Sequence, residues 1–217
     1  MKYIKLFENF NQSEIDDICE KYGIENYTIN PDGSIDVDGD VGICNEELTK
    51  LPLKFNRVSG EFDCSRNGLT TLEGCPNYVG EDFLCNNNQL TNLIGCPNYV
   101  GEDFNCYINN LTSLEGNVNY IGGNFNCGWN NLTILDGCPK EVGGGFGFTK
   151  NPIFNVISLF GEVRIYLEYQ ETYNFLRKDS KIVKHLLIEA LNDYNDFYNK
   201  NKELSELSEE IKGYTYI

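Results

Sequence analysis

The decapeptide GCPNYVGEDF occupies residues 74–83 and recurs unchanged at residues 95–104, which places the two copies 21 positions apart. Stepping along the chain by 21 residues extends this relation far beyond the decapeptide. A unit this short cannot bury its own apolar edge, so such units stack on their neighbours. The sequence therefore predicts a solenoid in which each turn takes 21 residues.

Five columns of apolar residues keep this register over six turns. The first column contains Val37, Val58, Val79, Val100, Ile121 and Val142. The second contains Val41, Phe62, Phe83, Phe104, Phe125 and Phe146, and the third contains Ile43, Cys64, Cys85, Cys106, Cys127 and Phe148. The fourth contains Leu48, Leu69, Leu90, Leu111, Leu132 and Ile153, and the fifth contains Leu51, Leu72, Leu93, Leu114, Leu135 and Val156. These columns are the predicted core.

The segment F-x-C is expected to be a short strand, because Phe and Cys then point inward and the residue between them points outward. Constant register makes these strands parallel, about 4.8 Å apart. A polar column follows each strand, where a stacked Asn can satisfy the backbone groups of a bend. Its members are Asn67, Asn88, Asn109, Asn130 and Asn151. Glu46 interrupts this column, so residues 37–57 are expected to form a distorted edge turn.

The pattern F-x-C-x-x-N-x-L-T-x-L resembles the leucine-rich-repeat core L-x-L-x-x-N-x-L-x-x-L over roughly residues 37–156. The repeats, together with YTINPDGSIDVDGDV at the front and GYTYI at the end, are also similar to uncharacterised proteins of large tailed phages and environmental sequences. This resemblance implies an α/β solenoid of about five to six turns with short parallel strands. It also implies a binding scaffold rather than a chemical activity.

The front of the chain is expected to cap the solenoid. Ser13 is the expected N-cap of a helix over residues 14–22, which Gly23 ends. Two alternating runs around Pro31-Asp32-Gly33 predict a hairpin. Residues 1–36 are therefore interpreted as a helix and hairpin cap.

The composition changes after Pro152, where Cys disappears and helical spacing begins. We expect residues 152–217 to form three or four helices that cap the last turn, with breaks at Gly161 and Gly213. The solenoid itself is assigned to residues 37–151.

The charge balance excludes several classes of partner. The chain has 33 acidic and 17 basic residues, a net charge of −16. Nucleic acids and anionic membrane surfaces require clustered Lys and Arg, so neither is expected to bind. The chain shows no apolar run of the roughly 20 residues of a membrane span, and its start lacks the pattern of a secretory signal. We therefore expect a cytoplasmic protein with its 9 cysteines as thiols.

The cysteines form two stacks, which raises the question of a metal site. The first stack is Cys64, Cys85, Cys106 and Cys127, and the second is Cys75, Cys96 and Cys138. The chain has no C-x-x-C, and its only histidine is His185. We interpret the thiols as core packing rather than as zinc ligands. No cysteine follows Cys138, which also argues against a thioester-forming ligase.

Other candidate sites are weaker. Asp36, Asp38, Asp40 and Glu47 match part of a calcium-loop template, but Val41 stands where glycine is required, so a solvated acidic hairpin is favoured. The pairs Glu81-Asp82 and Glu102-Asp103 are copies of one motif and are interpreted as an exposed edge rather than as a catalytic pair. The run 143–145 of glycines lacks the G-K-[ST] of a phosphate loop. We expect no catalytic residue, cofactor or metal, and hence no enzyme.

The outward positions around each strand vary, whereas the inward ones do not. If the strands share one face, these positions tile it with an apolar and aromatic patch flanked by amides. We predict that this face binds a protein. Its residues are Arg66, Leu84, Asn86, Asn87, Asn105, Tyr107, Ile108, Asn126 and Trp129. The alternative is that Trp129 simply packs on Tyr107.

The first ten residues, MKYIKLFENF, are similar to head-targeting peptides of large tailed phages, because Leu6-Phe7-Glu8 matches their cleavage pattern. The alternative is an amphipathic lead-in that packs on the N-terminal cap. The leading functional hypothesis is a phage-encoded, non-enzymatic recognition module in the host cytoplasm. The alternatives are a structural or head-packaged virion protein, an acidic mimic that occupies a basic host protein, and an enzyme within residues 152–217. The partner and the oligomeric state stay open at this stage.

Overall fold

A computed structural model describes residues 10–116, 118–153, 170, 176, 181–182, 184–198 and 215–216. The chain divides into two compact units. The first comprises residues 1–130 and 136–148, and the second comprises residues 131–135 and 149–217. Each is described here by itself. No helix among the described residues combines the length and the apolar character that crossing a membrane requires.

The first unit opens with helix α1, Gln12–Tyr22. Its N-cap is Asn11, not Ser13 as expected, and the helix is correspondingly longer. The Asn11 side chain accepts a hydrogen bond from the Glu14 backbone N–H, and the Glu14 carboxylate accepts one from the Asn11 N–H. This reciprocal capping box satisfies two N–H groups, which explains why Asn11 is the cap. Gly23 ends the helix with a φ of 64°.

The expected hairpin is confirmed. Strand β1, Tyr27–Ile29, pairs antiparallel with β2, Ile35–Val37. The second strand of the hairpin also pairs in parallel with β4, so it is the first strand of the solenoid as well. Their register shifts between Ile35 and Asp36, opposite Phe55 and Arg57. This irregularity lies at the end of residues 37–57 and does not involve Glu46, on which the expectation of a distorted turn is based.

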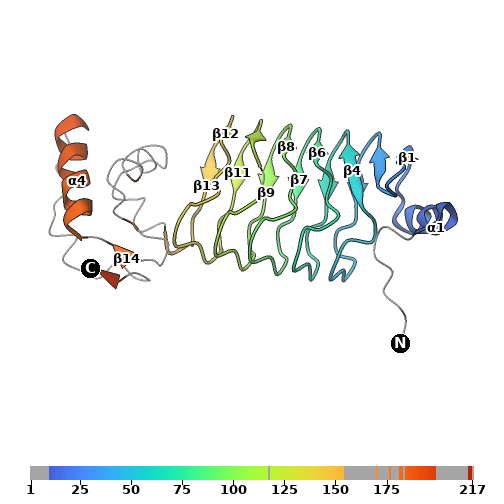
Figure 1. Cartoon of the computed structure of the whole chain (residues 1–217), viewed down its shortest axis with the longest axis horizontal. Helices are drawn as coiled ribbons and strands as arrows, with labels where there is room; N and C mark the ends of the chain where they lie inside the picture. The colour runs from blue at the N-terminus through green and yellow to red at the C-terminus, as the bar shows by residue number, and fades with distance from the viewer. Residues whose placement is uncertain are drawn as a thin grey trace. The chain divides into compact units, whose positions relative to one another are not determined.

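The solenoid contains two parallel sheets, to which each turn contributes one strand apiece (Figure 1). Beyond β1 and β2, the first sheet consists of β4 (Phe55–Val58), β6 (Tyr78–Val79), β8 (Tyr99–Val100), β10 (Tyr120–Ile121) and β12 (Glu141–Val142). The second sheet consists of β3 (Val41–Gly42), β5 (Phe62–Asp63), β7 (Phe83–Leu84), β9 (Phe104–Asn105), β11 (Phe125–Asn126) and β13 (Phe146–Gly147).

The 21-residue period and the parallel stacking are confirmed by the register of the strands. In the second sheet Phe62 pairs with Phe83 and Phe83 with Phe104, and in the first sheet Val79 pairs with Val100. One strand per turn was predicted from F-x-C, whereas the structure has two. From residue 24 to residue 153, leaving residue 117 aside, the structure describes strands, bends and turns but no helix. The fold is therefore a β-solenoid of about five turns, and the expected α/β solenoid is not seen.

The core runs along the axis between the two sheets. The rings of Phe62, Phe83, Phe104 and Phe125 are fully buried, and successive centroids lie 4.9–5.9 Å apart. The described leucines of the two leucine columns are buried beside them, except Leu48, which is half-buried. Burying one Phe or Leu side chain stabilises a fold by about 1.5–3 kcal/mol. Each additional turn buries a further set of these side chains, so the stabilisation increases with the number of turns.

One glycine column is required by the close approach of successive turns. A Cβ atom at Gly101 would lie 1.9 Å from the carbonyl oxygen of Gly80, and one at Gly80 would lie equally close to that of Ser59. Gly122 and Gly143 are equally restricted. The glycine of N-Y-V-G therefore sets how tightly the turns stack.

The second unit contains helix α4, Lys184–Tyr198, which lies within a segment predicted to be helical. Its residues Leu187, Ala190 and Leu191 are buried. Strand β14, Lys181–Ile182, pairs in parallel with β15, Thr215–Tyr216. Most of the other helical segments predicted for residues 152–217 lie outside the described residues, and a capping role for this region stays a prediction.

Candidate interaction face

The bend after each strand of the second sheet is held by the asparagine column. The Nδ2 group of Asn109 donates to the carbonyl oxygens of Cys85 and Cys106, each at 3.1 Å. Its Oδ1 atom accepts from the Leu90 N–H at 3.0 Å. Asn88 and Asn130 repeat this arrangement in their own turns. Each asparagine thus ties two consecutive turns together and determines the path of the chain beside the strand.

The thiol column lies inside the solenoid. Cys64, Cys85, Cys106 and Cys127 are fully buried, and no cysteine forms a disulfide. Burial, followed by the neighbouring thiols, raises the pKa of Cys85 and Cys106 far above the usual value, so both stay protonated. In the second stack, burial raises the pKa of Cys138 to about 12. Among the described residues, no group of three or more His, Cys, Asp or Glu side chains is arranged to hold a metal ion.

The residue before each asparagine of the asparagine column adopts a left-handed backbone conformation. The φ angles are 54° at Arg66, 55° at Asn87, 53° at Ile108 and 52° at Trp129. Asn tolerates this conformation, whereas a β-branched residue rarely adopts it. The sequence does not indicate this feature, because Ile and Trp are not residue types that favour a left-handed backbone.

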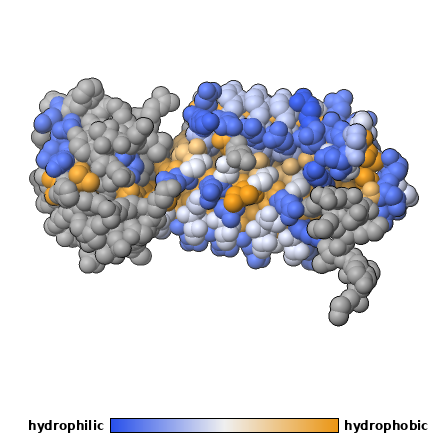
Figure 2. All heavy atoms as spheres, viewed as in Figure 1, coloured by the Kyte–Doolittle hydropathy of each residue, from blue (hydrophilic) through white to orange (hydrophobic). Residues whose placement is uncertain are grey.

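These left-handed positions expose the largest apolar side chains near the second sheet. Trp129 is 52% exposed and Ile108 is 38% exposed. The ring of Tyr107 is half-buried and meets Trp129 edge to face, with centroids 6.4 Å apart. Leu84 is also half-buried. Figure 2 shows hydrophobic surface running lengthwise along the solenoid between more hydrophilic rows.

The amides of the predicted face are partly occupied by local hydrogen bonds. The Oδ1 atoms of Asn105 and Asn126 accept from the N–H groups of Tyr107 and Gly128, each at 3.1 Å. Asn86 and Asn87 are half-buried, and Arg66 is exposed. All nine predicted face residues lie in the first unit. We call Leu84, Tyr107, Ile108 and Trp129 the apolar patch.

A second side-chain ladder precedes the strands of the second sheet. The Oδ1 atom of Asp82 accepts from the Asp103 N–H at 2.7 Å, and that of Asp103 accepts from the Asn124 N–H at 2.6 Å. Asn124 accepts in turn from the Gly145 N–H, and Asp40 accepts from the Glu61 N–H. The pairs Glu81-Asp82 and Glu102-Asp103 were interpreted as an exposed edge. Their aspartates in fact accept hydrogen bonds from the backbone of the next turn. Their spacing of 21 residues is the signal that could have revealed this.

Three of the four acidic residues considered for calcium make similar contacts. Asp36 accepts from the Asn30 and Asn56 amides, Asp38 accepts from the Ser59 hydroxyl, and Asp40 accepts from a backbone N–H. These hydrogen bonds occupy an oxygen atom on each carboxylate and link neighbouring turns.

An aromatic ladder on the first sheet was also missed. The rings of Tyr78 and Tyr99 stack at 4.8 Å with an angle of 2° between their planes, and Tyr99 and Tyr120 stack at 4.9 Å. The Arg57 guanidinium lies over the Tyr78 ring, 3.8 Å from its centroid. The recurrence of N-Y-V or N-Y-I every 21 residues was the available signal. The ring faces stack on each other, so this ladder mainly stabilises the sheet.

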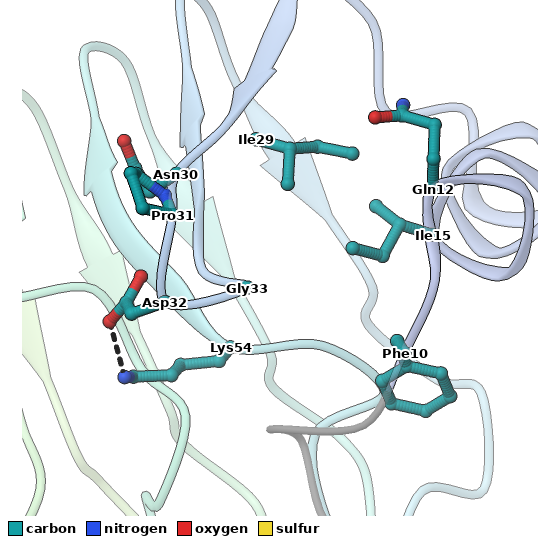
Figure 3. Close-up of a pocket in the computed structure, with 9 residues that line it drawn as sticks. All are labelled: Phe10, Gln12, Ile15, Ile29, Asn30, Pro31, Asp32, Gly33 and Lys54. Atoms are coloured by element: carbon teal, nitrogen blue, oxygen red, sulfur yellow. Dashed lines mark hydrogen bonds and ion pairs between the residues drawn. The ribbon is translucent and has the colours of Figure 1, made fainter.

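A pocket lies between α1 and the hairpin (Figure 3). Ile15 and Ile29 point toward one another across it, and Phe10 lies below them. At its rim Lys54 forms a 2.6 Å salt bridge with Asp32, whose pKa is lowered by this hydrogen bond and by those from Ser34. The nine lining residues include no cysteine, histidine or second carboxylate, so they provide no nucleophile and base pair.

No protein-family model matches the chain, and comparisons with curated proteins and with solved structures give no significant match.

Proposed function

We propose that the protein is a non-enzymatic scaffold that binds another protein through the apolar patch and the polar residues around it. The observation that carries this proposal is the placement of Ile108 and Trp129. Both side chains are exposed, and both occupy left-handed backbone positions that Asn or Gly would occupy at lower cost. Apolar residues that are kept at a cost in folding energy while much of the side chain stays exposed are better explained by contact with a partner.

The proposal is tested by affinity purification from cells that express tagged wild-type protein, Trp129→Ala or Ile94→Ala. Ile94 is 58% exposed and has an ordinary backbone conformation, so it is the matched control. Loss of a co-purifying protein with Trp129→Ala but not with Ile94→Ala, at unchanged melting temperatures, supports the proposal. Equal retention by all three proteins contradicts it.

We also propose that the repeats are of the leucine-rich type and that the chain is phage-encoded and acts in the host cytoplasm. The support is the F-x-C-x-x-N-x-L pattern with its asparagine column, and the resemblance at the two ends. Mass spectrometry of purified phage particles tests the location. If the particles contain stoichiometric amounts of the chain, the cytoplasmic hypothesis is rejected in favour of a virion protein.

A further inference from the structure

The apolar patch borders a group of acidic side chains on the same sheet. Leu84 pairs in register with Asp63 on one side and with Asn105 on the other. Neighbouring strands are about 4.8 Å apart, so a carboxylate and an apolar side chain lie next to each other on the outward surface. The other acidic residues lie just before the strands: Asp40, Glu61, Glu81, Asp82, Glu102 and Asp103.

These carboxylates outnumber the basic residues of the predicted face, which include Arg66. Within the part of the first unit that the structure describes, none of them forms a salt bridge, since the ion pair found there joins Lys54 to Asp32. Partial burial, then the charges of Asp63, Asp82, Asp40 and Glu81, raise the pKa of Glu61. The repulsion among these groups would be relieved by a cation placed over them.

Resting on the protein-binding role proposed above, we infer that the partner is a protein segment in which Lys or Arg side chains flank an apolar side chain. The apolar side chain packs against Ile108, Trp129 and Leu84. The basic side chains lie over Asp63, Glu61 and Asp82. A guanidinium or ammonium group near the indole of Trp129 would add a cation–π contact. An acidic segment is repelled by the same surface.

Binding is read out by the intrinsic fluorescence of Trp129, the only tryptophan of the chain. The probe is a display library of random peptides without tryptophan, selected on the wild-type protein. Selected peptides are then measured on two variants. The anchor variant is Trp129→Ala, measured by peptide labelling because it lacks the fluorophore. The charge variant combines Glu61→Gln, Asp63→Asn and Asp82→Asn.

The charge variant is expected to keep the fold, because an asparagine already occupies the equivalent position in a later turn. There the Asn124 side chain accepts a hydrogen bond from the Gly145 N–H, as Asp82 does from the Asp103 N–H. Asp82→Asn therefore retains the acceptor and removes the charge. Asp63→Asn likewise retains an acceptor for the Ser65 N–H. Melting curves of the variant verify that the solenoid is intact.

We expect the selected peptides to be enriched in Lys or Arg beside an aliphatic or aromatic residue. Both variants should bind the selected peptides about tenfold or more weakly than the wild-type protein does. Added salt should lower the affinity further. Peptides that depend on Trp129 but show no basic enrichment and bind the charge variant equally would overturn this inference and leave the proposed function standing. If no selected peptide depends on Trp129, the proposed function fails as well.

Discussion

The side-chain oxygen of Asn109 accepts a hydrogen bond from the backbone N–H of Leu90, 19 residues earlier and one turn away, at 3.0 Å. The same amide donates to two backbone carbonyl groups. The Cys85 and Cys106 carbonyl groups also accept from Asn88 and Asn130. Because Asn109 is only 7% exposed, removing its side chain leaves the Leu90 N–H without a partner in the interior and takes one of two amide donors from each carbonyl. The asparagine column is therefore expected to contribute strongly to stability.

Asn109→Ala should lower the free energy of unfolding by about 1–3 kcal/mol, because one buried N–H group, that of Leu90, is left unsatisfied. The matched control is Asn110→Ala, at the exposed neighbouring residue, which should change stability by less than about 0.5 kcal/mol. Urea denaturation of both variants measures the difference. Equal stabilities would contradict the role assigned to the ladder.

Gly101→Ala tests the close approach of successive turns. The added Cβ would lie 1.9 Å from the Gly80 oxygen, so the backbones must separate, and we expect a loss of about 3 kcal/mol or more. At Gly68 a Cβ would meet nothing closer than 3.5 Å, so Gly68→Ala should cost less than about 1 kcal/mol. Thermal melting of the two variants compares them, and a Gly101 variant as stable as the Gly68 variant would refute the stacking argument.

Ile108→Asn should stabilise the protein by about 0.5–1 kcal/mol, because Asn adopts a left-handed backbone at lower cost than a β-branched residue. Asn87 already occupies the equivalent position one turn earlier, with a φ of 55°. The control Ile94→Asn removes an exposed isoleucine without such strain and should bring no gain. Urea midpoints provide the comparison. Destabilisation by Ile108→Asn would mean that the side chain has a role in folding.

Glu61→Gln should raise the melting temperature at pH 7. The pKa of Glu61 is raised in the folded state, so the folded state holds this proton more tightly than the unfolded state does. Stability is therefore lost as the pH rises from the ordinary carboxyl pKa through the raised value, and the substitution removes that loss. At about pH 3.5, below the ordinary value, the gain should vanish. Glu73→Gln, at an exposed residue, is the control for removing one charge, and a gain that is the same at both pH values would exclude this explanation.

Thiol titration should separate Cys44 from the buried column. Cys44 is exposed, whereas Cys85 and Cys106 are buried with a strongly raised pKa. An aromatic disulfide reagent at pH 8 should modify Cys44 at least about tenfold faster than these two, which should react only after unfolding. Cys44→Ser should abolish the fast phase, as judged by absorbance and by mass mapping. Rapid modification of Cys85 in the native protein would contradict the burial of the column.

The columns Phe83, Cys85 and Leu90 could be predicted from the sequence because their information is local and repeated. An F-x-C segment alternates with a period of two. Its four copies in register, with V-x-I and F-x-F at the two ends, exclude a chance pattern. The second strand of each turn escaped prediction because only one of its residues points into the core, as Val100 does in Tyr99–Val100, whereas F-x-C contributes two. Alternation cannot be recognised in so short a segment, and its pairing partner comes from another turn.

The sequence predicts which residues form the candidate face, but it does not predict their backbone conformation. The sequence identifies Trp129 and Ile108 as outward residues, yet their residue types argue against the left-handed backbone that they adopt. At Trp129 that conformation precedes Asn130, whose side chain donates hydrogen bonds to the carbonyl groups of two turns. The helix cap differs for a related reason, since Asn11 and Ser13 are both good caps and only the reciprocal contact with Glu14 distinguishes them.

The sequence by itself determined the period, the residues that point inward and the parallel stacking, because a 21-residue unit that cannot bury its own apolar edge must repeat its contacts with every neighbour. Only the tertiary structure decided that each turn has two strands, that aspartates as well as asparagines link the turns, and that acidic and apolar side chains lie side by side at Asp63 and Leu84. Those features depend on the distance between successive turns, which exists only once the turns have stacked.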